Sequence, residues 1–223
     1  MKAVTVFLLG FTLSGVWIAL NTFLYGALNK KIKNFWVTSP AISGAIPALI
    51  IYLIAKDHPF HFERLADIKI WAIAAIATVV SSAVVLITKS DKKKISGKEL
   101  SLQCFAGALM EVPQRAMMMP FVIMLLNKRG INPLQGVIIT ALIWLAGMIF
   151  QSALMTKNFG IKAIVSEMLP SLVFSLGVGY AFYETGCIFV PMAFHVLERI
   201  LSNVAFIGKE VKAEDKVELA KAA

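Results

Sequence analysis

Two pairs of ionisable residues stand inside apolar stretches of this 223-residue chain. Glu111 and Arg115 are four residues apart within residues 102–126, and His195 and Arg199 are four apart within residues 187–207. This spacing puts the members of each pair on one face of a helix. Ionisable side chains are costly at membrane depth, so they face a bundle interior and are functional candidates. The alternative is that each pair only fixes helix packing.

Pro113 lies between Glu111 and Arg115. A proline inside a helix removes one hydrogen bond and clashes with the carbonyl four residues back, which here belongs to Leu109. The sequence therefore predicts a kinked or unwound backbone beside the charged pair.

The composition predicts that these segments lie in a membrane. The chain is 58% hydrophobic and its mean hydropathy is +0.77, whereas a soluble domain is about 45–50% apolar. Several apolar runs approach or exceed the roughly 20 residues that span a bilayer. We expect an all-α, polytopic transmembrane bundle of about seven spans, in the cell membrane and in contact with lipid. The predicted spans are residues 3–28, 35–55, 70–88, 102–126, 134–155, 161–183 and 187–207.

The basic residues indicate the orientation of the bundle. The net charge is +9, and the lysines gather in the connectors between apolar runs. With seven spans, 14 of the 22 Lys and Arg residues fall on one side and six on the other, while Arg115 and Arg199 lie within spans. The positive-inside rule then places the N-terminus outside and the C-terminus inside. The charge is explained by topology, so we expect no nucleic-acid partner.

The chain divides into three expected parts. Residues 1–100 hold the first three spans, residues 101–207 form a membrane core with both charged pairs, and residues 208–223 form a charged cytoplasmic tail. Two cysteines are too few for a disulfide framework or a zinc site. One Glu and one His do not fill the three protein ligands of a catalytic zinc. We therefore expect no metal and no cofactor.

The motifs of the core resemble those of the CAAX protease and bacteriocin-processing intramembrane peptidases, also called the Abi family. The first family motif is a glutamate pair, three residues and an arginine, and it corresponds to Met110 through Arg115. The second is an aromatic residue, three residues and a histidine, matched by Trp144 through Met148. The third is a histidine, three residues and Asn or Asp, matched by His195 and Arg199 after a lead-in of Thr185, Gly186 and Pro191.

The resemblance implies peptide hydrolysis without a covalent intermediate. In the family a glutamate activates a water, an arginine holds a glutamate, and the last histidine and the asparagine stabilise the oxyanion. This assigns catalytic positions to Glu111, Arg115, His195 and Arg199, acting on a peptide or membrane-protein substrate. The sequence departs from the family at three positions, where Met110, Met148 and Arg199 replace a glutamate, a histidine and an asparagine. Methionine is neither an acid nor a base.

Three hypotheses follow. The first is a divergent active peptidase with Glu111 as the base. The second is a non-catalytic relative that binds a peptide or a membrane protein, for example in bacteriocin immunity or regulation. The third is a small transporter or lipid-binding protein with an anion pocket. On chemical grounds we favour the second, because the residues that assist the water are missing.

Overall fold

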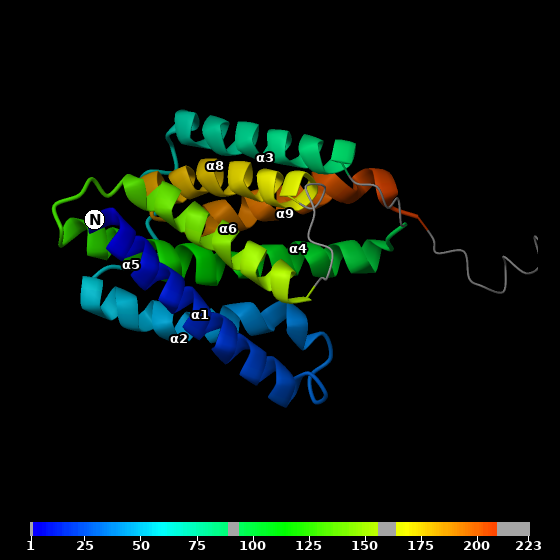
Figure 1. The fold of residues 1–223 in the computed structure, drawn as a ribbon. Coiled ribbons are helices and arrows are strands. Elements are labelled where there is room, and N and C mark those ends of the chain that lie inside the picture. Colours follow the sequence, from blue (N-terminus) through cyan, green and yellow to red (C-terminus); the bar gives the residue numbers. More distant parts are fainter. Residues whose placement is uncertain (1, 89–93, 156–163, 209–223) are drawn as a thin grey trace, which may run out of the picture.

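The computed structural model describes residues 2–88, 94–155 and 164–208. Within these ranges the chain forms seven helical segments and no β-strand, which confirms the predicted all-α bundle (Figure 1). The segments are α1 (Lys2–Leu28), α2 (Phe35–Ala55), α3 (Ile68–Thr88), α4 (Gly97–Glu111) continued by the π-helix η1 (Val112–Met118) and α5 (Met119–Asn127), α6 (Gln135–Met155), the π-helix η2 (Ile164–Met168) continued by α8 (Leu169–Thr185), and α9 (Phe189–Asn203) followed by the 3-10 turn η3 (Val204–Phe206).

The surface of the bundle is suited to lipid. Helices α1, α2, α3 and the continuous helix over 97–127 are long and apolar enough to cross a membrane. Large apolar side chains are exposed on them, with Phe23 72% and Ile87 84% accessible. The protein is therefore a multi-pass membrane protein in contact with lipid. Its orientation, its division into three parts and the cytoplasmic position of the tail stay predictions, and residues 209–223 lie outside the described ranges.

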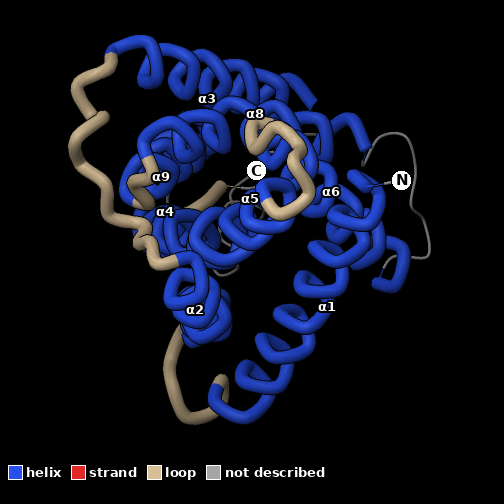
Figure 2. Tube along the Cα trace, turned by 90° about the vertical axis from the view of Figure 1, so that its left-hand side faces the viewer, coloured by secondary structure: helices blue, strands red, loops and turns tan. Residues whose placement is uncertain are grey.

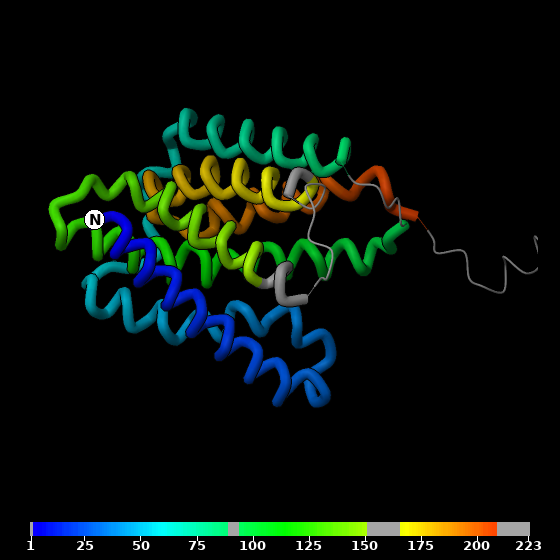
Figure 3. Tube along the Cα trace, viewed as in Figure 1, coloured from blue at the N-terminus to red at the C-terminus, as the bar shows by residue number. Residues whose placement is uncertain are grey.

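The helix through α4, η1 and α5 lies inside the bundle. Helix α9 packs against α4, α3 packs along α8, and α2 packs against η1 (Figure 2). Helix α1 crosses α2 at an angle and reaches α5 and α6 near its N-terminal end (Figure 3). Gly44 allows the close approach of α2 to η1, because a Cβ atom there would lie 3.1 Å from the Cα atom of Pro113. These contacts bring both charged pairs to one interior region.

The predicted break at Pro113 takes the form of the π-helix η1. Its wider turn is shown by the N–H of Met119, which donates to the carbonyl of Gln114 five residues back. Single-turn π-segments inside α-helices are rare and are frequent at functional sites. The wider turn displaces the backbone just where Glu111 and Arg115 must meet the neighbouring helices.

A connector between α2 and α3 holds the turn that begins α9. The N–H of Ile188 donates to the carbonyl of Pro59 at 2.9 Å. Arg64 forms an ion pair with Glu184 at 3.2 Å between Nη1 and Oε2. These contacts fix the α8–α9 turn and thereby the start of the helix that carries the second charged pair.

The connector predicts a pH dependence of stability centred on His61. Its ring nitrogens lie 2.8 Å from Asp57 Oδ1 and 3.0 Å from Glu63 Oε1. The hydrogen bond with Asp57 is the main cause that raises the pKa of His61. A raised folded-state pKa adds stability below the unfolded value of about 6.5, and this gain is lost as pH rises through the raised value. Thermal unfolding should therefore show Asp57→Asn losing most at pH 5.5 and least at pH 9.

The matched control for this prediction is the double variant Asp57→Asn/His61→Gln. Once His61 is replaced, adding Asp57→Asn should lower the unfolding temperature by no more at pH 5.5 than at pH 9. A loss from Asp57→Asn that is equal across the whole pH range would contradict the role of His61.

The predicted orientation is tested by cysteine labelling. Lys94 is exposed and precedes α4, whereas Lys128 is exposed at the end of α5. Both native cysteines are buried, so their background labelling is low. An impermeant maleimide should label Lys128→Cys in intact cells and should label Lys94→Cys only after permeabilisation. The reverse pattern would overturn the orientation deduced from charge.

Candidate functional site

The four residues singled out in the sequence form one connected chain of contacts. His195 Nδ1 lies 2.5 Å from Glu111 Oε1, and Arg115 Nε lies 3.4 Å from Glu111 Oε2. On the other side of the imidazole, Arg199 Nη2 lies 3.4 Å from His195 Nε2. The packing of α9 on α4 thus joins the two charged pairs through the contact between His195 and Glu111.

Glu111 and Arg115 form a fully buried ion pair. Both residues are 0% exposed. Arg115 Nη2 donates to the carbonyl of Ser175 in α8 at 3.1 Å. Arg115 Nη1 has no hydrogen-bond partner among the described residues. Each charge therefore depends on the other, because an uncompensated charge inside a protein costs several kcal/mol.

The contacts of His195 fit one neutral tautomer of its ring. A guanidinium group has only donors, so a hydrogen bond from Arg199 requires a lone pair on His195 Nε2. The proton of a neutral ring then sits on Nδ1 and is donated to Glu111. His195 thus has a neighbour on each ring nitrogen, Glu111 at Nδ1 and Arg199 at Nε2.

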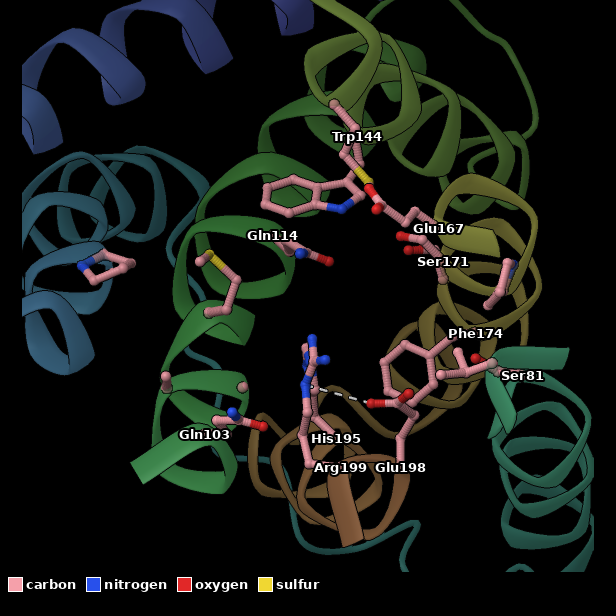
Figure 4. Close-up of a pocket in the computed structure, with 18 of the residues that line it drawn as sticks. Ser81, Gln103, Gln114, Trp144, Glu167, Ser171, Phe174, His195, Glu198 and Arg199 are labelled. Atoms are coloured by element: carbon pink, nitrogen blue, oxygen red, sulfur yellow. Dashed lines mark hydrogen bonds and ion pairs between the residues drawn. The ribbon is translucent and has the colours of Figure 1, made fainter. Parts of the chain in front are cut away.

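A cavity of about 570 Å³ lies beside this chain of contacts (Figure 4). Its walls come from the start of α2, the end of α3, α4, η1, α6, η2, the first half of α8, and α9. Its polar lining comes from α4, η1, η2, the first half of α8, and α9, and includes Gln103, Gln114, Ser171, Ser175, His195 and Arg199. Its remaining lining includes Trp36, Trp144 and Phe174. The cavity can hold a side chain or a short segment of a ligand.

The cavity separates the four predicted residues into two groups. His195 and Arg199 line it, and so do Met110 and Met148 at the two departed motif positions. Glu111 and Arg115 are not among its lining residues. The sequence places both pairs toward the bundle interior, and from this we expected one common cavity. Instead the imidazole of His195 lies between the cavity and the buried carboxylate, because Glu111 turns toward α9.

Glu198 directly precedes Arg199 in α9, and because adjacent helical positions do not share a face we expected it to point away from Arg199; the structure corrects this. It lines the cavity, is 7% exposed, and its Oε2 lies 3.4 Å from Arg199 Nε. Both side chains are long enough to turn back toward each other from adjacent positions. Glu167 and Gln114 also line the cavity and were not singled out. Glu167 falls within the predicted span 161–183, so the rule on charges in spans could have found it.

Gly107 sets the spacing between α4 and His195. A Cβ atom at this position would lie 2.7 Å from His195 Cδ2. We expect Gly107→Ala to shift the imidazole away from Glu111 and to destabilise the protein by about 1–3 kcal/mol, the usual cost of overpacking. Thermal unfolding in detergent measures this effect. Gly26→Ala is the matched control, because nothing lies within 4 Å of its added Cβ atom. Equal unfolding temperatures for Gly107→Ala and the natural sequence would contradict the contact.

These features define a helical membrane domain with a polar interior cavity and an ionic cluster at its wall. Residues 100–201 match the family described as type II CAAX prenyl endopeptidase Rce1-like. The match confirms, over these residues, the resemblance seen in the motifs. Comparisons with curated proteins and with solved structures find no match.

Proposed function

We propose that this membrane protein binds a peptide or a segment of a membrane protein in the cavity of its Rce1-like domain and does not hydrolyse it. Such a protein acts in regulation or in bacteriocin immunity. The observation that carries the proposal is that Met110 and Met148, and not Glu111, line the cavity.

Hydrolysis needs a base within hydrogen-bond reach of the attacking water, directly or through one further water. A thioether is a weak acceptor and takes no proton at neutral pH. Glu111 is 0% exposed, with its two oxygens directed toward His195 and Arg115. A water in the cavity therefore meets methionine at the two motif positions where the family has a carboxylate and an imidazole.

The groups that would stabilise an oxyanion also argue against hydrolysis. An oxyanion is stabilised by donors that are aimed at it before the reaction begins. Arg199 Nη2 lies 3.4 Å from His195 Nε2, and in the tautomer with its proton on Nδ1 this nitrogen has no proton to donate. Arg199 is in turn held by Glu198 at 3.4 Å. The side chains of His195 and Arg199 thus contact groups of the protein itself and are not aimed at a substrate, which supports binding without turnover.

An active endopeptidase is the second candidate, and one observation favours it. Glu198 is a carboxylate that lines the cavity next to His195 and Arg199. In an active enzyme it would be the base, and Glu198→Gln would abolish cleavage. An anion pocket is less well supported, because two glutamates and one arginine line the cavity among the described residues.

Binding is tested with the full chain in detergent and with fluorescent prenylated CAAX peptides and bacteriocin-leader peptides. We expect at least one peptide class to bind, and Ala106→Trp, which fills the cavity, to weaken that binding. Ala193→Trp is the matched control, because Ala193 is exposed on α9 and does not line the cavity. Absence of binding, or equal binding by Ala106→Trp, would contradict the proposal.

A further inference from the structure

The charges in the cavity do not balance among the described residues. Glu198 from α9 and Glu167 from η2 enter it from different walls (Figure 4). Arg199 is the only cationic residue among the described residues of its lining, and it pairs with Glu198. Glu167 makes no hydrogen bond or ion pair with any described residue. Two carboxylates and one guanidinium therefore line the cavity, which leaves one negative charge in excess among the described carboxylate and guanidinium side chains.

A second feature points to a ligand with N–H groups. Gln114 is 5% exposed, and its amide is directed into the cavity (Figure 4). It forms no side-chain hydrogen bond with a described residue. Ser175, which is 2% exposed, also lines the cavity with a hydroxyl group. Buried polar groups are normally hydrogen-bonded, so the side chains of Gln114 and Ser175 favour a ligand with polar groups.

The aromatic lining fits the same kind of ligand. Trp144 and Phe174 face the cavity from α6 and α8 (Figure 4). The face of an aromatic ring attracts an ammonium or guanidinium group, most strongly for tryptophan. Long basic side chains also carry an apolar stem below the charge, which suits Met110 and Met148 in the lining.

We propose that the cavity takes the side chain of a lysine or arginine of the bound peptide, with its charge between Glu167 and Glu198. This inference rests on the proposed function and names the ligand group that the site selects. A peptide side chain is favoured over a lipid headgroup for a chemical reason. A choline headgroup has no N–H to donate, and every zwitterionic headgroup would bring a phosphate anion toward the two carboxylates.

The experiment compares two water-soluble peptides by calorimetric titration of the full chain in maltoside detergent, with empty micelles as the blank. One is acetyl-Leu-Leu-Lys-Leu-Leu-amide, and the other carries acetyl-lysine at its centre, which removes the charge. We expect the lysine peptide to bind at least about tenfold more tightly, because its charge would meet the buried carboxylate of Glu198 as well as that of Glu167. Glu167→Gln and Glu198→Gln should each reduce that preference. Glu99→Gln, at an exposed position outside the cavity, should leave it unchanged.

Glu167 is itself exposed, so its variant keeps the test valid if Glu198→Gln fails to fold. If both peptides bind equally and Ala106→Trp weakens their binding, the charge preference is overturned and the proposed function stands. If neither of these two peptides binds, and no prenylated or leader peptide binds either, both this inference and the proposed function are contradicted. Competition by phosphatidylethanolamine with no preference for lysine would assign the cation to a lipid and overturn the inference.

Discussion

Glu111→Ala is expected to lower the free energy of unfolding by about 3–5 kcal/mol, the usual cost of removing one partner of a buried ion pair. The reason is Arg115, which is 0% exposed, donates to the carbonyl of Ser175, and would lose its ion-pair partner with the carboxylate. His195 loses the acceptor of its Nδ1 proton at the same time. Thermal and denaturant unfolding of the purified protein in detergent measures the loss.

Two further variants separate charge from packing. Glu111→Leu/Arg115→Met should recover most of the lost stability, because an apolar pair of similar volume is often neutral or stabilising in place of a buried ion pair. Glu99→Ala, at an exposed position in the first turn of α4, should cost no more than about 1 kcal/mol. An unaltered stability of Glu111→Ala would contradict the ionic cluster.

Met110→Glu/Met148→His/Arg199→Asn is expected to create peptidase activity. All three positions line the cavity, so the new carboxylate and imidazole would stand where a water can enter. General acid–base assistance contributes about 10²–10⁴-fold in rate. An oxyanion donor adds about 10²–10³-fold. Removing Arg199 also frees His195 Nε2 to face the substrate.

The matched control for this gain of activity is Met110→Gln/Met148→His/Arg199→Asn, which keeps the size of the new side chain and lacks the base. Product should form with the glutamate version alone, as measured by mass spectrometry on prenylated peptides. Equal product from both versions would assign the activity to another group. A folded glutamate version without product would show that the cavity does not place these residues as the family does.

The parts of the site that follow local rules could be predicted from the sequence. Spacing by four gave the two pairs Glu111/Arg115 and His195/Arg199 on α4–η1 and on α9. Pro113 predicted the backbone break that became η1. The apolar runs predicted seven helical segments within a few residues of their bounds, because each segment carries its own hydropathy signal.

The enclosure of the cavity could not be predicted in this way. Gln114, Glu167 and Glu198 come from three segments, and whether they face one space depends on how the helices pack. The same holds for the direction of Glu111, which turns to His195 because α9 lies against α4. Pairing rules along one helix say which residues share a face and do not say which neighbour that face meets.

The most direct test of the account is turnover by the natural sequence. The full chain, purified in detergent and shown to bind a prenylated CAAX or leader peptide, is incubated with that peptide and the mixture is analysed by mass spectrometry. We predict that the bound peptide stays intact, because the cavity offers Met110 and Met148 where a water would have to be activated. Cleavage by the natural sequence that is lost in Glu198→Gln or in Glu111→Gln would contradict the account and would make the protein an active endopeptidase.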